Sequence, residues 1–393
     1  MATYVVLRDL KPVTSSTFER PLGLRDVSEQ APSEPDIAVE EINSRSKVLA
    51  LSAEPRVRAI TRVMPTQLVR PLDAAAGGNE PTAWGVTAVG ADTSQRTGKD
   101  VTVAVLDTGI DASHPAFSGV EIAEQDFSGS GNGDHQGHGT HCAGTIVGRA
   151  VNGTRIGIAP GVTKLWVGKV LADDGGGNSD MLFRGIQWAV QQGAHVISMS
   201  LGFDFPGLVK RLADEGWPID LATSVGLEAY RGNLRMFDAL MEMIRSRRAF
   251  EQGTIVIAAA GNESRRNIDP NYEIGASLPA AAEDVLSVGA LELSGEELRI
   301  APFSNAFPQI AAPGVGILSA RAGGGLVGKS GTSMAAPHVA GVAALWWEDV
   351  LTSPLPATSQ TVLARLIANA TTQRLNPAAD VADRGVGLVR APR

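Results

Sequence analysis

The sequence predicts an α/β protein, a three-layer sandwich with a mostly parallel central sheet, preceded by a small α+β unit. From about residue 82 onward, short and nearly continuous apolar runs alternate with helical stretches. Buried parallel strands and their crossover helices give this pattern. Before residue 75 the pattern differs, because strands of alternating polarity flank one short helix.

The N-terminal unit is predicted to span residues 1–75. Its expected strands and its helix are Thr3–Leu7, Asp36–Ile42, Ser44–Ala53 (the helix) and Val57–Val63. The Gly- and Pro-containing stretch 71–81 is predicted to be exposed, and residues 76–81 are expected to link the two units.

The main domain is predicted to span residues 82–393. A helix is expected at Asp180–Gln192, with Ser179 as its cap, and the segment 203–250 is interpreted as a helical insertion of two pieces. Active sites of parallel sheets gather at the carboxyl ends of the strands. The expected strands are 101–106, 165–170, 195–199, 254–260 and 285–291.

Composition excludes several classes of protein. The formal net charge of -8 and the lack of a basic patch argue against nonspecific nucleic-acid binding. No apolar run is long enough to span a membrane. The single cysteine, Cys142, rules out an internal disulfide. The N-terminus lacks the features of a secretory signal, so we expect a cytoplasmic protein, or a secreted one if a leader has been removed.

Asp107 is the first candidate for chemistry, in the segment VLDTGID of residues 105–111. It lies at the end of a predicted buried strand, where a carboxylate can fix the tautomer of a histidine. Asp-Thr-Gly also occurs in aspartic proteases, which need two copies, and we find no second copy. A strand-end turn or cap is the alternative.

The second candidate is His138, in the segment GHGTHCAG of residues 137–144. It is predicted near a helix N-terminus, exposed enough to act as a general base. The alternative is a metal-binding pair with His141. The spacing of three without an intervening glutamate does not match the zinc pattern, so we interpret His141 as packed and hydrogen-bonded.

Ser333 is the third candidate, in the segment GTSMAAPHVAG of residues 331–341. At the first turn of a helix it would have unsatisfied backbone N–H groups beside it and a favourable dipole for negative charge. The alternative is a helix cap. His338 is too close along the chain to serve easily as the base, and a buried packing role is expected.

The order Asp, His, Ser is that of subtilisin rather than of chymotrypsin or the α/β-hydrolases. The sequence resembles the subtilisin-like serine proteases, or subtilases, over about residues 82–393 outside the insertion. The resemblance implies the subtilisin-like fold, Asp107, His138 and Ser333 as the catalytic triad, and Asn262 as the side-chain donor to the oxyanion. It further implies substrate contacts at Gly175, Gly176, Gly177, Ser200, Leu201, Gly202, Ala260, Gly261 and Ser277.

An extended substrate is expected to pair as an added strand with both edge segments, 175–177 and 200–202. A calcium loop at 173–180 is the rival interpretation, but its acidic residues do not match the EF-hand spacing. Ser277 is expected at the floor of the main side-chain pocket. Since nothing charged is evident there, we expect uncharged, apolar or aromatic preferences.

The N-terminal unit resembles the subtilase propeptide, which is an inhibitor and folding aid. The resemblance implies that Leu68–Asp73 lies in the groove like a product and that self-cleavage falls within Leu72–Asn79. The alternative is a module that is never removed.

The chemistry requires no cofactor. Ala116 and Val151 stand where the family's strong calcium site has its ligands, so this site is expected to be missing, although structural calcium elsewhere is possible. The insertion is expected to shape or cover the substrate site, or to bind a partner.

The leading functional hypothesis is a serine endopeptidase made as a self-processing zymogen, acting through an acyl-enzyme on Ser333. A dedicated intracellular processing protease or transpeptidase for one partner is the alternative. The third possibility is a noncatalytic binding scaffold, but such relatives generally lose a triad member and this chain has all three.

Overall fold

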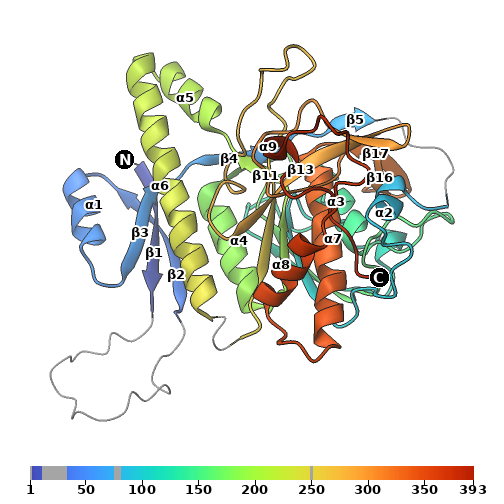
Figure 1. Cartoon of the computed structure of the whole chain (residues 1–393). Helices are drawn as coiled ribbons and strands as arrows, with labels where there is room; N and C mark the ends of the chain where they lie inside the picture. The colour runs from blue at the N-terminus through green and yellow to red at the C-terminus, as the bar shows by residue number, and fades with distance from the viewer. Residues whose placement is uncertain (1, 11–32, 75–80, 248–250) are drawn as a thin grey trace, which may run out of the picture.

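The computed structural model describes residues 2–10, 33–74, 81–247 and 251–393. Figure 1 shows a small N-terminal unit on the left and a larger α/β domain on the right, joined by a segment that crosses the domain. The architecture has the predicted class, because one mostly parallel sheet carries helices on both faces.

The N-terminal unit is a three-stranded antiparallel sheet with one helix. The central strand β1 (Ala2–Asp9) pairs with β2 (Pro35–Ile42) and with β3 (Val57–Arg62). Helix α1 (Arg45–Ser52) begins after Ser44, whose hydroxyl accepts a bond from the Lys47 backbone N–H. This capping bond satisfies one of the otherwise free N–H groups of the first turn.

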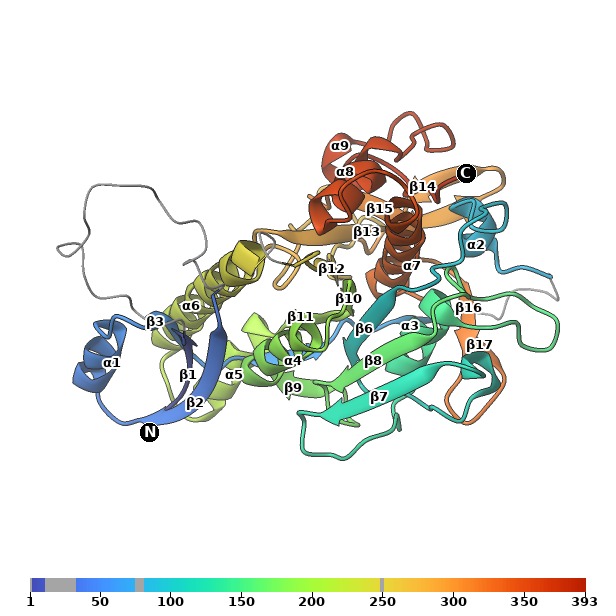
Figure 2. The same cartoon turned by 90° about the horizontal axis from the view of Figure 1, so that it is seen from below.

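The main sheet has the order β14-β13-β12-β10-β6-β8-β7, with β15 also paired to β13. Only the β13–β14 pair is antiparallel, so the carboxyl ends of the central strands lie at one edge (Figure 2). The strands are β6 (Thr102–Asp107), β7 (Glu121–Asp126), β8 (Lys164–Lys169), β10 (Val196–Met199), β12 (Ile255–Ala259), β13 (Val285–Ser294), β14 (Glu297–Ile300) and β15 (Ile310–Pro313).

Both faces of the sheet are buried, as the continuous apolar runs predict. Along β6, Val103 and Val105 belong to the core under α3 and α7, whereas Ala104 and Leu106 belong to the core under α4 and α6. Alternate side chains of a strand point to opposite faces, so a strand between two helical layers must be apolar throughout. These helices are α3 (His138–Val147), α4 (Ser179–Gln191), α6 (Ile219–Ser246) and α7 (Thr332–Leu351).

Smaller elements complete the domain. Helices α2 (Trp84–Ala88), α8 (Ser359–Ala368) and α9 (Val381–Arg384) lie around α7 and the C-terminal strands, and a short 3₁₀ helix covers Pro115–Phe117. Short strands outside the main sheet form two three-stranded sheets, with orders β11-β4-β9 and β16-β17-β5. Their strands are β4 (Pro65–Leu68), β5 (Leu72–Ala74), β9 (Gly176–Asn178), β11 (Leu201–Phe203), β16 (Ile317–Ala320) and β17 (Leu326–Ser330).

The prediction that Ser179 caps α4 is wrong. The helix begins at Ser179 itself, and Asn178 occupies the cap position without a side-chain bond. The Ser179 hydroxyl instead accepts a bond of 3.1 Å from the backbone N–H of Met64. It therefore holds the segment that follows the N-terminal unit.

The insertion forms two helices, as predicted, and it contacts the N-terminal unit. Helix α5 (Phe205–Asp214) packs against the first half of α6, and α6 packs against β3 (Figure 1). The buried Asn233 of α6 donates from Nδ2 to the Arg62 carbonyl at 3.0 Å and to the Thr61 hydroxyl at 3.3 Å. The insertion therefore contacts the N-terminal unit, and its expected role at the substrate site or toward a partner stays a prediction.

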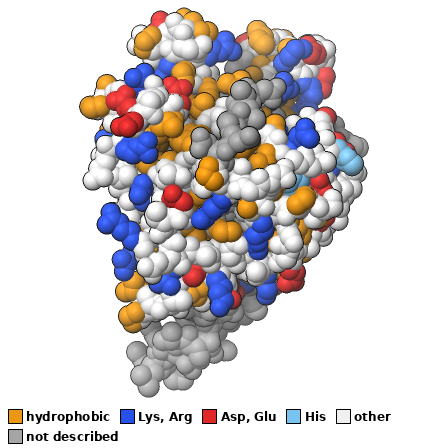
Figure 3. All heavy atoms as spheres, turned by 90° about the vertical axis from the view of Figure 1, so that its right-hand side faces the viewer, with side chains coloured by type: hydrophobic (Ala, Val, Ile, Leu, Met, Phe, Trp, Pro, Cys, Tyr) orange, Lys and Arg blue, Asp and Glu red, His pale blue; other side chains and the backbone are white. Residues whose placement is uncertain are grey.

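Within the part of the chain that the structure describes, no helix combines the length and the apolar character needed to cross a bilayer. Figure 3 shows the face on the right-hand side of Figure 1, where basic side chains are dispersed among acidic and uncharged ones. That the protein does not bind nucleic acid stays a prediction.

Candidate active site and its occupied groove

The substrate groove predicted from the two edge segments is filled by the chain's own residues 65–68. Strand β4 pairs antiparallel with β11 on one side, where Leu68 lies opposite Leu201 and Gln67 opposite Gly202. On the other side it pairs with β9, and the Leu68 N–H donates to the Gly175 carbonyl at 2.9 Å. Both edges therefore bind an extended strand, as an added strand of peptide would be bound.

The segment continues past the predicted catalytic serine. Leu72–Ala74 forms β5, which pairs with β17, so the stretch predicted as a linker from residue 71 begins as a strand, although Leu72 is exposed as predicted. The groove is also occupied earlier than the predicted Leu68–Asp73, because its strand begins at Pro65. Of the predicted cleavage region Leu72–Asn79, residues 75–79 lie outside the described residues.

Asp107 and His138 meet where β6 ends and α3 begins. The His138 Nδ1–H donates to Asp107 Oδ1 at 2.8 Å, and this oxygen also accepts the Thr108 backbone N–H at 2.8 Å. With Nδ1 as the donor, a neutral imidazole has its lone pair on Nε2, which is the tautomer a general base needs.

His138 is fully buried, so the prediction that it is exposed is wrong for this state of the chain. Asp107 and Ser333 are buried as well, and residues 65–70 run across the site. Within the described part of the chain His138 Nε2 has no hydrogen-bond partner. The atom that would accept a proton is enclosed and unpaired.

Ser333 is the second residue of α7, which starts at Thr332 after Gly331. Its hydroxyl donates to the Val69 carbonyl at 3.0 Å and, more weakly, to the Ser200 carbonyl at 3.4 Å. The Ser200 hydroxyl in turn donates to the Ser333 carbonyl at 3.1 Å. The serine is therefore turned toward the bound segment rather than hydrogen-bonded to His138.

Asn262 presents its amide to the carbonyl one residue further along the segment. Its Nδ2 donates to the Arg70 carbonyl at 3.1 Å. Its Oδ1 accepts both the N–H and the hydroxyl of Thr332, each at 2.8 Å, which fixes the orientation of the amide. Sequence reasoning missed this role of Thr332, although the residue precedes Ser333 within the quoted motif.

Gly202 and Ser277, two of the predicted substrate contacts, lie close to Val69 of the bound segment. A Cβ placed on Gly202 would be 3.4 Å from Ser277 Oγ and 3.6 Å from Val69 Cγ2, so both groups approach the same space. The Ser277 N–H donates to the Ala260 carbonyl at 3.1 Å, and the Gly261 N–H donates to the Thr332 hydroxyl at 3.1 Å. These predicted contact residues thus gather around one point of the groove.

His141 and His338 are buried and hydrogen-bonded to backbone carbonyls, as the sequence predicts. The Nε2–H of His141 bonds the carbonyls of Ile317 and Val327, and the Nδ1–H of His338 bonds the carbonyl of Met334 at 2.7 Å. Burial is the main cause that lowers the pKa of His141 to about 3 and that of His338 to about 4. Both rings are therefore neutral near neutral pH.

Because the pKa values of these two histidines are lowered in the folded chain, we expect the free energy of unfolding to fall in acid. The unfolded chain takes up protons on them below about pH 6.5, whereas the folded chain does not until pH 4 to 3. Between pH 7 and pH 5 each should lower the free energy of unfolding by about 2 kcal/mol. Urea unfolding of the inactive Ser333→Ala chain at both pH values would measure the change.

In that background His338→Gln should unfold with a pH dependence smaller by about 2 kcal/mol between pH 7 and pH 5, even if it is less stable at pH 7. The exposed His135, changed to Gln, is the control for replacing a histidine outside the core. An equal pH dependence in the His338 variant and the parent would contradict the prediction.

Among the described residues one set of side chains is close enough together to hold a metal ion: Asp107, His138 and Cys142. Burial, with a further contribution from Asp107, raises the pKa of the Cys142 thiol well above its ordinary value. A protonated thiol is a poor ligand, since metals bind the thiolate. Ala116 and Val151 are buried, and the absence of the family's calcium site stays a prediction.

The fold and this arrangement are those of a serine hydrolase built on a parallel sheet. Comparison with known proteins narrows this class to one family, because the model of the subtilase family matches residues 98–387. The chain is 35% identical over 256 residues to the major intracellular serine protease of Bacillus subtilis (strain 168), covering 63% of this chain and 68% of that protein.

Two further relatives agree. The intracellular serine protease of Paenibacillus polymyxa is 35% identical over 260 residues (64% of this chain, 68% of that protein). The thermostable alkaline protease of Halalkalibacterium halodurans is 32% identical over 309 residues (77% of this chain, 70% of that protein). The chain belongs to the subtilase family. It is a subtilisin-type serine endopeptidase, and its substrates are proteins or peptides.

Proposed function

We propose that the endopeptidase acts through Ser333, His138 and Asp107. Ser333 Oγ attacks the substrate carbonyl while His138 Nε2 takes its proton, and Asp107 holds the ring and stabilises the imidazolium. His138 then passes the proton to the leaving amine, which leaves an acyl-enzyme for water to hydrolyse. The observation that carries this assignment is the 2.8 Å bond between His138 Nδ1 and Asp107, which leaves Nε2 free.

Asn262 and the backbone N–H of Ser333 would stabilise the oxyanion. Asn262 Nδ2 already donates to a carbonyl of the bound segment, and Thr332 holds the amide in that direction. A preoriented donor needs no reorganisation when charge develops on the oxygen, which is why such donors lower the barrier.

The N-terminal unit and the segment after it would act as an intramolecular inhibitor. The nucleophile and the oxyanion donor bond two different carbonyls of the segment, since Ser333 bonds that of Val69 and Asn262 bonds that of Arg70. Neither carbonyl has both the nucleophile and the oxyanion donor. The next residue is Pro71, whose nitrogen carries no hydrogen and whose ring restrains the chain. The segment therefore blocks the site without being a good substrate in this position.

Activation would require the segment to leave or to be cut nearby, within Leu72–Asn79. Two of the relatives are intracellular serine proteases, and this supports the proposal that the enzyme works inside the cell. The tie between α6 and β3 supports the proposal that the N-terminal unit is the insertion's binding partner.

The intact mass of the natural chain and of Ser333→Ala, followed over time after purification, tests the zymogen hypothesis. The natural chain should lose its N-terminal residues up to a bond within Leu72–Asn79, and its peptidase activity should rise in step. The mutant should stay whole alone and should be cut when mixed with mature natural enzyme. Full activity of an uncut natural chain would show that the N-terminal unit is a retained module. Cleavage of the mutant alone would point to a contaminating protease.

A further inference from the structure

Lys169 is a buried lysine beside the site that the mechanism above does not use. It is the last residue of β8, paired in register with Asp107 of β6 on one side and with Asp126 of β7 on the other. Its side chain is only 2% exposed. Burying an ammonium group is costly unless it is paired and hydrogen-bonded, so its partners show what it holds.

One partner lies at the groove. Lys169 Nζ is 2.6 Å from Asp173 Oδ1, and Asp173 begins the segment 173–178 that forms one edge of the groove. A turn follows directly, in which the Ala172 N–H bonds the Gly176 carbonyl at 2.8 Å. Gly175 in this turn accepts the bond from the strand in the groove. The position of this edge is thus tied to the lysine.

The other partner lies in the loop that leads to His138. Lys169 Nζ donates to the Gly133 carbonyl at 3.0 Å. The next residue, Asp134, accepts the hydroxyl of Thr108 at 2.9 Å and the backbone N–H of Gly137 at 2.7 Å. It also accepts the N–H and the hydroxyl of Thr140 within α3.

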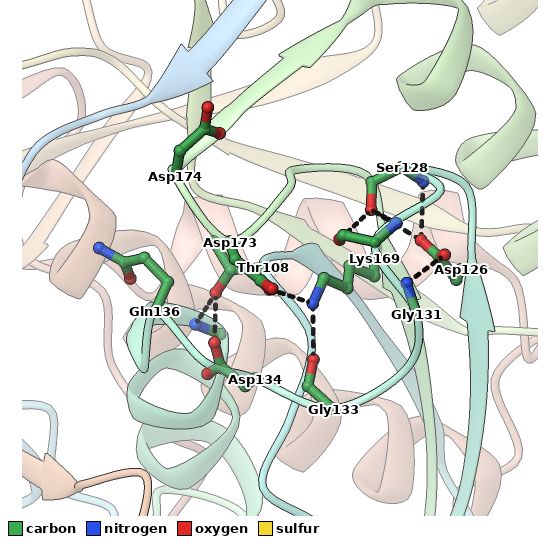
Figure 4. A network of polar contacts seen from close by, with 12 residues as sticks. Thr108, Asp126, Ser128, Gly131, Gly133, Asp134, Gln136, Lys169, Asp173 and Asp174 are labelled. Atoms are coloured by element: carbon green, nitrogen blue, oxygen red, sulfur yellow. Dashed lines mark hydrogen bonds and ion pairs between the residues drawn. The ribbon is translucent and has the colours of Figure 1, made fainter.

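These bonds make one connected network, which Figure 4 shows with Lys169 at its centre. Thr108 follows Asp107 and Gly137 precedes His138, so the Asp134 carboxylate ties together the two backbones that carry the Asp–His pair. In addition, the Thr108 hydroxyl accepts the Gly139 N–H at 3.0 Å. The groove edge and the general base therefore share one buried anchor.

We propose that Lys169 is a positioning residue that couples the groove edge 173–178 to the loop 133–137 and so to His138, an inference that rests on the proposed role of His138 as the general base. A substrate strand pairs with β9 at this edge. Because Lys169 is bonded to both the edge and the loop, the position of the edge fixes that of the loop. Without the ammonium, the edge and the loop would each keep their local bonds but lose their fixed relation. Peptides that use the edge should then be aligned less well with His138.

The test compares Lys169→Met with Lys164→Met, an exposed lysine on the same strand. Full-length chains are brought to constant activity, and their active serines are counted with an organophosphonate. Two substrates with the same leaving group are used, namely an extended peptide that reaches both groove edges and a single-residue ester that does not.

For Lys169→Met, kcat/KM for the extended peptide should fall on the order of a hundredfold, because small misplacements of reacting groups have effects of this size. For the ester, which does not contact this edge, kcat/KM should fall only about tenfold. Lys169→Arg should restore part of the loss, and Lys164→Met should match the natural enzyme. An equal loss on both substrates would overturn the proposal, because a merely structural lysine would act in that way.

A second measurement does not depend on activity. In the full-length Ser333→Ala chain, Lys169→Met should speed backbone hydrogen exchange in both 173–178 and 133–140, whereas Lys164→Met should change neither. The partly exposed Asp173, changed to Asn, disturbs the core less and should give a smaller effect in the same direction. Combined with Lys169→Met it should add nothing, as expected for two members of one pair. Additive effects, or faster exchange in only one segment, would refute the coupling.

Discussion

Ser333→Ala is expected to lower kcat for peptide hydrolysis by about a millionfold, which is the size of loss seen when subtilisin loses its serine or its histidine. The alanine removes the only atom that can form the acyl-enzyme, and it leaves the fold unchanged because the hydroxyl's partners are carbonyls of Val69 and Ser200. Hydrolysis of an extended chromogenic peptide by equal amounts of protein would measure the loss.

The matched control is Ser353→Ala, just beyond the other end of α7, whose hydroxyl donates to the Val350 carbonyl and accepts the Leu355 N–H. It should keep the activity of the natural enzyme. Residual activity of Ser333→Ala within a hundredfold of the natural enzyme would exclude Ser333 as the nucleophile.

Asp107→Asn is expected to lower kcat by about ten thousandfold at neutral pH. The amide has no negative charge, so it cannot stabilise the imidazolium that forms when His138 takes the proton of Ser333. The measurement is kcat and KM on the same extended peptide, where KM should change little because the groove is untouched.

Asp92→Asn, at an exposed position, is the control for the loss of one carboxylate and should change neither kcat nor KM. Equal losses in the two variants, or a loss in KM alone for Asp107→Asn, would contradict the assigned role. The Asp107→Asn chain should also mature slowly, which gives a second readout from intact mass.

The sequence alone predicted the parallel sheet and the candidate site residues. Strands β6, β10 and β12 are continuous apolar runs because both faces of each are covered, and this pattern is local and visible in the sequence. The same holds for Asp107, His138 and Ser333, since each lies in a short motif with glycine neighbours at the end of a strand or the start of a helix. Their meeting follows from the topology, which brings the ends of parallel strands together.

Other parts could not be predicted from the residues. Strand β4 contains proline, threonine and glutamine and has no strong strand pattern, because it is held mainly by backbone bonds to β9 and β11, with Leu68 as its one apolar side chain in the core. Lys169 is a lone basic residue at the end of an apolar run, and only its buried contacts with Asp173 and Gly133 show what it does. Both cases depend on partners distant in sequence, which leave no periodic signal.

The sequence by itself thus determined the family of folds, the kind of chemistry and the residues expected to carry it, because motifs and periodicity are local properties. Only the tertiary structure decided that the groove is filled by residues 65–68 and that His138 is enclosed beneath the segment. It also decided that Ser333 bonds the Val69 carbonyl, whereas Asn262 bonds the carbonyl of the next residue, Arg70. The physical reason is that these contacts are made by main-chain groups of segments distant in sequence. Since main-chain groups are nearly the same in every residue, the sequence carries no signal of which residues pair.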